Sequence, residues 1–443
     1  MFERIDPVDV TLGMFIHKLE GNWFLHPFWR ARFLLTDPAQ LARLHASRVP
    51  AVIIDTDRGL APRPSADAPS TGPTPNAGLS RPLARRLPLP PRAAPPVAAT
   101  AATGRFLSAP PAQTVQAFGR ASTVADRGLK VVANVFLEMR LGKAITPATV
   151  GPVITAIMTS MQSNPFAFNG LMRFRRDSEM VYRHALATSA LMIALGRNLH
   201  LAPIELHAAG LAGLLLDSGI SLLPTADDGR SADPRDLPAE QWRDHVRLGH
   251  DFILRSRLSE PVARACLEHH ERHDGGGWPN GTGAMGLSLL GRMAAICDAY
   301  DLLISPADGS AGADPAAALC AMRADTGAYD PDLLCVFETA VGVWPTGSLV
   351  MLRSARLAVV IDQNRDALDR PMVAVIFAPA TGQRIDDLWI DLNTCYGADA
   401  IAGPAAIADL PVAMQADAHA ALAMAIDRAT GTAKRPRRAP KAA

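Results

Sequence analysis

The sequence predicts a mainly α-helical protein, a helical bundle with a small α/β domain before it and a small β-rich appendage after it. From about residue 116 to 341, apolar residues recur at three- and four-residue spacing, which is typical of amphipathic helices. Short runs rich in Val, Ile, Leu and Phe precede residue 60 and follow residue 346, which favours strands. We therefore predict a small N-terminal domain at 1–60, a Pro/Ala-rich flexible linker at 61–115, a helical domain at 116–341, a β-rich appendage at 346–393, and an Ala-rich helix with a basic disordered tail at 394–443.

The composition argues against several classes of protein. Hydrophobic residues make up 49% of the 443 positions, which is enough for a sizeable core, and the net charge of +1 gives no electrostatic reason to expect a nucleic-acid partner. The sequence contains no run of 18 apolar residues, so it predicts no membrane span. The five cysteines form no CxxC pair and the first residues lack a signal-peptide core, so we expect a cytoplasmic protein with reduced thiols.

The predicted elements follow the two changes of hydrophobic period. In the N-terminal domain we expect strands at 10–19, 33–36 and 51–55, and a short helix at 39–47 capped by Asp37. The helical domain should contain helices at 131–140, 147–163, 178–199, 203–218, 238–257, 261–267 and 287–303. The appendage should contain strands at 348–352, 357–362, 371–377 and 388–392, followed by a helix at about 404–429.

One polar string stands out against this helical background. It reads His269-His270-Glu271-Arg272-His273-Asp274-Gly275-Gly276-Gly277-Trp278-Pro279 and follows directly on an apolar helix. The glycines allow positive φ and a close approach of the backbone to a ligand, and the proline prevents the helix from continuing. Paired imidazoles beside carboxylates suit iron, manganese or zinc. The structural alternative is a helix C-terminus with solvated histidines.

This string resembles the signature of the HD-GYP family, metal-dependent phosphohydrolases that cleave the bacterial second messenger cyclic di-GMP. The family string is His-His-Glu-x-x-Asp-Gly-x-Gly-Tyr-Pro, and only Trp278 departs from it. The resemblance extends over about residues 177–340. Residues Gly13-Met14-Phe15-Ile16 and Val52-Ile53-Ile54-Asp55-Thr56 resemble the domain of unknown function that often precedes HD-GYP domains. The resemblance implies an HD-type helical bundle.

The resemblance also implies roles for individual residues on successive helices. It assigns metal binding to His184, Asp217, His245, His269, His270 and Asp298. It assigns catalysis to Asp217 and Asp301. The glycine-rich turn is expected to bind substrate through Asp274, Gly275, Gly277, Trp278 and Pro279. Taken singly, His184, Asp217 and His245 each also fit a solvated helix face, but their order and spacing relative to the signature favour a common site.

Four departures from the family pattern affect this expectation. The His-Asp pair of the family is Leu216-Asp217 here, and the lysine that normally contacts the substrate phosphate is Ile220. A glutamate found in some members is Met180, and the arginines that usually follow the last aspartate are absent from 306–314. Because Leu216 offers no donor, we expect one divalent transition metal and not two, iron or manganese with zinc as a further fit, held by Asp217, His245, His269 and His270.

Three functions are compatible with this sequence. The first is an active phosphodiesterase acting on cyclic di-GMP or its linear product. The second is a degenerate module that senses the nucleotide or binds a diguanylate cyclase or another signalling protein. The third is a structural fold without a ligand. The retained signature argues against the third and the departures argue against the first, so the sequence favours the second. It leaves a homodimer open.

Overall fold

The structure is a computed structural model, and the chain divides into two units, residues 1–87 and 88–443. All residues assigned above to metal, catalysis or substrate lie in the part that the structure describes, whereas 61–105 of the predicted linker and the tail from 433 lie outside it. The described residues are 2–19, 33–36, 38–45, 51–60, 106–175, 180–223, 239–305, 312–395 and 399–432.

The first unit contains a four-stranded antiparallel sheet with the order β1-β4-β2-β3. Its core is formed by Val10, Met14, Ile16, Leu35, Leu44, Val52 and Ile54. Strand β1 was not predicted, because Phe-Glu-Arg-Ile offers little apolar surface and three of its four residues are exposed. The elements are β1 (Phe2–Ile5), the 3-10 helix η1 (Pro7–Asp9), β2 (Phe15–Leu19), β3 (Phe33–Leu34), α1 (Pro38–His45) and β4 (Val52–Asp55).

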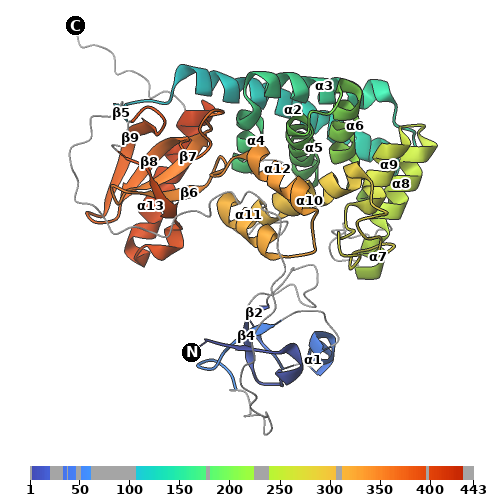
Figure 1. Cartoon of the computed structure of the whole chain (residues 1–443), viewed down its shortest axis with the longest axis horizontal. Coiled ribbons are helices and arrows are strands. Elements are labelled where there is room, and N and C mark those ends of the chain that lie inside the picture. The colour runs from blue at the N-terminus through green and yellow to red at the C-terminus, as the bar shows by residue number, and fades with distance from the viewer. Residues whose placement is uncertain are drawn as a thin grey trace, which may run out of the picture. The chain divides into compact units, whose positions relative to one another are not determined.

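The second unit is built around a helical bundle (Figure 1). Its elements are α2 (Ala112–Arg140), α3 (Pro147–Ser163), α4 (Pro165–Phe174), α5 (Met180–Asn198), α6 (Pro203–Leu215), the 3-10 helix η3 (Ser218–Leu222), α7 (Ala239–Arg243), α8 (His245–Arg255), α9 (Glu260–Glu268), α10 (Leu289–Ile304), α11 (Pro315–Ala324) and α12 (Pro331–Val341). Helix α5 is the central one, since every residue from His184 to Gly196 is buried. It packs against α2, α6, α10 and α12.

A close approach between α5 and α6 sets the position of the site. Gly213 has no side chain, and a Cβ atom there would lie 2.7 Å from the backbone of Ser189. Two hydroxyls secure the contact, because Thr188 donates to the carbonyl of Gly213 and Ser189 to that of Gly210, each at 2.7 Å. His184 lies one turn before Thr188 and Asp217 one turn after Gly213, so the contact brings both to the same level of the bundle.

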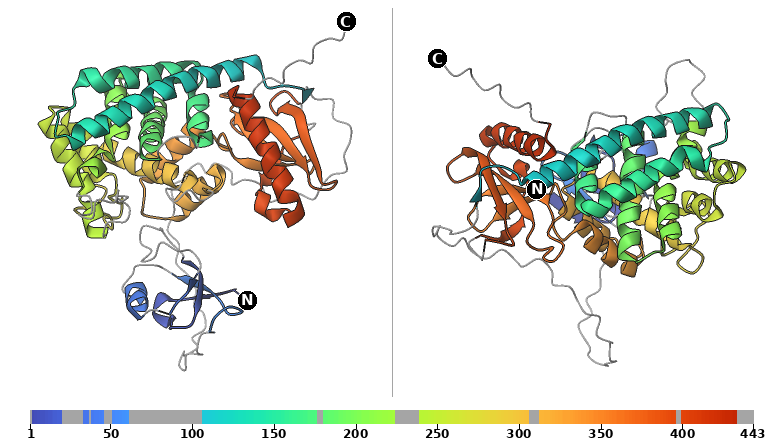
Figure 2. Two further views of the ribbon diagram at one scale, coloured as in Figure 1. Left: turned by 180° about the vertical axis from the view of Figure 1, so that it is seen from behind. Right: turned by 90° about the horizontal axis from the view of Figure 1, so that it is seen from above.

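A six-stranded antiparallel sheet with the order β10-β6-β7-β8-β9-β5 lies at the end of the bundle. Helix α13 packs against β7, β8, β9 and α2, as Figure 2 shows from two further sides. The elements are β5 (Phe106–Leu107), β6 (Leu349–Leu352), β7 (Leu357–Asp362), β8 (Met372–Ala378), β9 (Gln383–Asp391), β10 (Ile401–Pro404), the 3-10 helix η5 (Ile407–Asp409) and α13 (Val412–Thr430).

Bundle and sheet share one hydrophobic core. The cluster of buried side chains that contains Phe118 and Phe337 also contains Phe377, Trp389 and Ala421. Polar contacts join the same parts, since Asp362 accepts hydrogen bonds from Thr114 Oγ1 at 3.0 Å and Asn164 Nδ2 at 3.2 Å. The predicted fold class, mainly α with small β-containing regions near both ends, is confirmed. Of the helices in the described ranges, none combines the length and apolar character needed to cross a membrane.

Candidate metal centre

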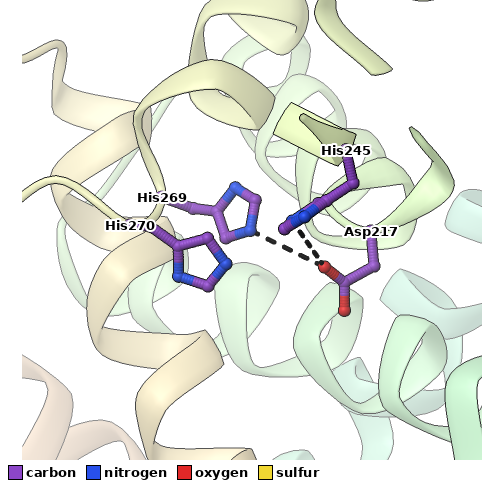
Figure 3. A group of neighbouring side chains, drawn as sticks. All are labelled: Asp217, His245, His269 and His270. Atoms are coloured by element: carbon purple, nitrogen blue, oxygen red, sulfur yellow. Dashed lines mark ion pairs between the residues drawn. The ribbon is translucent and has the colours of Figure 1, made fainter. Parts of the chain in front are cut away.

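The structure brings all six predicted metal ligands together in the bundle. Two overlapping groups share Asp217, and in each group one ligand atom per residue lies within 4.8 Å of all the others. The first group is Asp217, His245, His269 and His270 (Figure 3), and the second is His184, Asp217 and Asp298. They come from α5, the α6–η3 junction, α8, the end of α9 and α10, so residues up to 114 positions apart meet at one point.

In the first group the imidazoles are fixed by the backbone. His245 Nδ1 donates to the carbonyl of Trp242 and His269 Nδ1 to that of Cys266, each at 2.7 Å. In the neutral imidazoles the Nε2 atoms therefore carry the lone pairs. They face Asp217 Oδ1 at 3.4 Å for His245 and 3.7 Å for His269, the two dashed contacts of Figure 3. A backbone carbonyl that fixes the outer nitrogen in this way is the usual support of a metal-binding histidine.

The burial of these nitrogens tests whether a metal fits. Within the described residues, neither Nε2 atom of His245 and His269 has a hydrogen-bond partner, although both are buried. A buried polar atom without a partner costs about 1–3 kcal/mol, so its retention suggests a ligand that satisfies it. Three imidazoles and one carboxylate form a donor set for iron, manganese or zinc. The residues present therefore fit a transition-metal ion.

The charges at this group are arranged for a cation. Burial alone would raise the pKa of Asp217, but the nearby imidazoles of His245, His269 and His184 outweigh it and hold the pKa well below its usual value. Burial lowers the pKa of His270, and the neighbouring His269 and His245 lower it further. Asp217 is therefore ionised and His270 neutral, as metal ligands require. Burial would lower the pKa of His269, but Asp217 raises it, so a metal ion would have to displace the proton that this pair shares.

The second group is arranged differently. His184 Nε2 lies 3.0 Å from Asp298 Oδ1 and 3.4 Å from Asp217 Oδ2, while its Nδ1 lies 2.7 Å from Asp301 Oδ2. Burial would lower the pKa of His184, but the hydrogen bonds to Asp298 and Asp301 raise it well above its usual value. Asp301 thus contacts the outer nitrogen of His184 and belongs to neither ligand group. Leu216 is 1% exposed and offers no donor.

The glycine-rich turn is held by its own side chains. Glu271 is buried and accepts the backbone N–H groups of Asn280 at 2.7 Å and Thr282 at 3.0 Å. Asp274 accepts from the N–H of Gly276 at 2.8 Å and pairs with Arg272 at 2.8 Å. The predicted substrate residue Asp274 therefore faces its own loop.

The two predicted glycines of this turn meet different backbone requirements. Gly275 has a φ of +79°, a conformation that other residues rarely adopt. A Cβ atom at Gly277 would lie 2.4 Å from the backbone nitrogen of Arg272. Both positions therefore require glycine for the loop itself.

Aromatic rings surround the imidazoles on one side. Trp278 stacks on His270, with ring centroids 4.2 Å apart and an interplanar angle of 24°. Trp242 contacts His245 edge to face at 4.0 Å and lies 6.4 Å from Trp278. The sequence reasoning missed Trp242, although its position three residues before a predicted ligand is a signal that could have found it. Pro279 follows Trp278, and its carbonyl accepts from Arg247 at 3.2 Å.

The comparisons with known proteins agree with this geometry. Residues 165–333 match the HD domain, and residues 3–150 match a domain of unknown function, DUF3391. The cyclic di-GMP phosphodiesterase PA4108 of Pseudomonas aeruginosa is 35% identical over 405 residues, which are 91% of this chain and 92% of that protein. The chain belongs to the HD-GYP family. The resemblance seen in the sequence, including the N-terminal domain, is thereby confirmed.

Other HD-GYP-related proteins match shorter stretches. The 3'3'-cGAMP-specific phosphodiesterase 2 of Vibrio cholerae is 31% identical over 145 residues, 29% of this chain and 27% of that protein. The cyclic di-GMP phosphodiesterase response regulator RpfG of Xanthomonas campestris is 36% identical over 63 residues, 14% of this chain and 17% of that protein. The metal dependence of HD domains agrees with the His/Asp donor set described above.

Proposed function

We propose that this chain is a degenerate HD-GYP module of bacterial cyclic di-GMP signalling, with weak or no phosphodiesterase activity, that senses the nucleotide or binds a partner such as a diguanylate cyclase. The observation that carries the proposal is the contrast between the two ligand groups. One offers three imidazoles and a carboxylate, whereas the other offers one imidazole, two carboxylates and the apolar Leu216.

The first group supports binding of a single ion. A divalent metal held there would supply Lewis-acid chemistry toward a phosphoryl oxygen. His245 and His269 present their Nε2 lone pairs inward because their Nδ1 atoms donate to backbone carbonyls. Asp217 stays ionised between them. These residues are already oriented for the ion, so little side-chain freedom is lost when it binds.

The second group supports weak catalysis. Both ring nitrogens of His184 are engaged by carboxylates, and its raised pKa means that a proton already occupies the position where a second cation would be needed. Ile220 lies in η3, three residues after Asp217, and supplies no charge to a phosphate. Loss of one electrostatic contact to a reacting group typically costs about 3–4 kcal/mol of barrier. Both defects together leave hydrolysis slow.

An active phosphodiesterase is the second candidate function. It is favoured by the similarity to a protein named cyclic di-GMP phosphodiesterase over 91% of this chain. His184, Asp217 and Asp298 also remain close enough to contact one ion if the proton on His184 were displaced.

Metal content and turnover decide between the candidates. The purified chain is loaded with manganese or iron(II), and its metal is counted by elemental analysis while hydrolysis of cyclic di-GMP is followed by chromatography. We expect at most one ion per chain and turnover well below about 1 per second, a usual enzyme rate. Two ions with turnover above that rate would refute the degenerate function and support the active enzyme. Failure to bind metal and nucleotide under every loading condition would refute both.

A further inference from the structure

Two arginines border the candidate metal centre on the side of α7 and α8. The guanidinium of Arg243 lies 5.5 Å from the centroid of the Trp278 ring. Arg247 donates to the carbonyl of Pro279 at 3.2 Å and to Asn280 Oδ1 at 3.3 Å. Both side chains are exposed. Arg243 ends α7 and Arg247 lies in the first turn of α8, and both contact the same glycine-rich turn.

The arginines lie beside Trp278 and Pro279, next to His270 of the first ligand group. His245 and His269 are buried, whereas Asp217 and His270 are the partly exposed members. Trp278 stacks on His270, and Arg243 lies over Trp278. A ligand that reaches the ion from solvent at this side therefore passes these cations.

Neither arginine forms an ion pair within the part of the chain that the structure describes. In the described part of the chain, Arg243 contacts an aromatic ring and Arg247 contacts a carbonyl and an amide oxygen, and no carboxylate pairs with either. Other arginines of the bundle do have carboxylate partners, namely Arg264, Arg272, Arg292 and Arg323. A guanidinium that lies over a ring keeps its in-plane N–H groups free, and these match two oxygens of one phosphate.

We propose that Arg243 and Arg247 provide the cationic contacts to the phosphate groups of the bound dinucleotide. This inference rests on the proposed function. It assigns to α7 and α8 the positive charge that Ile220 does not supply. The charges are complementary, because a cyclic dinucleotide carries two phosphodiester groups of one negative charge each. The nucleotide is then held by its phosphates beside Trp278, with one phosphate within reach of the ion at Asp217, His245, His269 and His270.

The substitutions separate this role from simple support of the loop. Arg243→Gln and Arg247→Gln remove the charge. Arg247→Lys keeps the charge but loses the guanidinium Nη2 that donates to both Pro279 and Asn280. Arg255→Gln is the matched control, because Arg255 is an exposed arginine at the far end of α8. Thermal unfolding of each variant checks that the bundle is intact.

The experiment measures binding of cyclic di-GMP to the full-length, metal-loaded chain by calorimetry, at low and at high salt, with intact nucleotide verified afterwards. We expect each Arg→Gln change to weaken binding about tenfold, Arg247→Lys to retain most of the affinity, and Arg255→Gln to match the unaltered chain. The salt dependence should diminish in the double Arg→Gln variant. Unchanged affinity and salt dependence in that variant would overturn the inference while leaving the proposed function standing. If the unaltered chain binds no nucleotide, the nucleotide-sensing function is refuted, and the inference with it.

Discussion

Restoring the imidazole at position 216 tests the account of the metal centre directly. Leu216 follows the last residue of α6 and precedes Asp217, and its side chain is 1% exposed. We predict that Leu216→His lowers the stability of the metal-free chain and raises the number of bound ions from one to two. The variant chain should become markedly more stable when metal is added. The three results share one cause, a buried imidazole that only a cation can satisfy.

The size of the effect follows from the burial of Leu216. Removing a fully buried leucine forfeits roughly 1.5–3 kcal/mol of apolar transfer, and a buried nitrogen without a partner costs about 1–3 kcal/mol more. The free energy of unfolding should therefore fall by about 2.5–6 kcal/mol, a large part of the 5–15 kcal/mol typical of proteins. Metal at a hundred times its dissociation constant returns about 2.7 kcal/mol, and at a thousand times about 4.1 kcal/mol.

Chemical denaturation with and without manganese, together with elemental analysis, measures these quantities. Leu215→His is the matched control, because Leu215 is equally buried on the same helix but points about 100° away around the helix axis. It should lose stability without gaining metal or metal-dependent stability. If Leu216→His binds no second ion, or gains no more stability from metal than the unaltered chain does, the inferred position of the missing ligand is wrong.

Three further predictions concern the same region. Adding Ile220→Lys to Leu216→His should raise cyclic di-GMP turnover at least tenfold above either single variant, and no gain would show that the missing charge is not limiting. In the metal-free chain, the raised pKa of His184 contributes stability that is fully present below about pH 6.5 and is lost as the pH rises through the folded pKa. Denaturation across this range should show the loss, and His184→Gln should reduce the dependence to what the raised pKa of His269 contributes. Glu271→Gln replaces one of the two carboxylate oxygens that accept the backbone N–H groups of Asn280 and Thr282 by an NH2 group. We expect the free energy of unfolding to fall by about 1–3 kcal/mol and hydrogen exchange at those two amides to become faster. Unchanged exchange would contradict the role of Glu271.

Features with a local cause were predicted well from the sequence. Helix α3 has the bounds expected from its hydrophobic spacing and its N-terminal proline, Pro147–Ser163. The six ligand positions were assigned through resemblance to a family with a distinctive string, and the structure brings them to one point.

Features caused by tertiary contacts were not predictable in this way. The segment expected as one helix at 238–257 is broken at Asp244 into α7 and α8, and there the carbonyl of Trp242 accepts the side chain of His245. The pairing of His184 with Asp301 joins residues 117 positions apart, so no local sequence pattern predicts it. Strand β5 consists of two residues, too few for any period to be read.

Strand β5 has a consequence for how the chain is made. Phe106 and Leu107 pair with Ile390 and Trp389 of β9, and α2 begins a few residues later and packs against α13. During synthesis, β5 and α2 are therefore made long before β9 and α13, the elements that they pack against. A nascent chain released after α12 would leave the surface of α2 that packs against α13 uncovered. Chaperones should therefore engage this protein late in synthesis, and C-terminal truncations should aggregate even though they retain every residue of the metal centre.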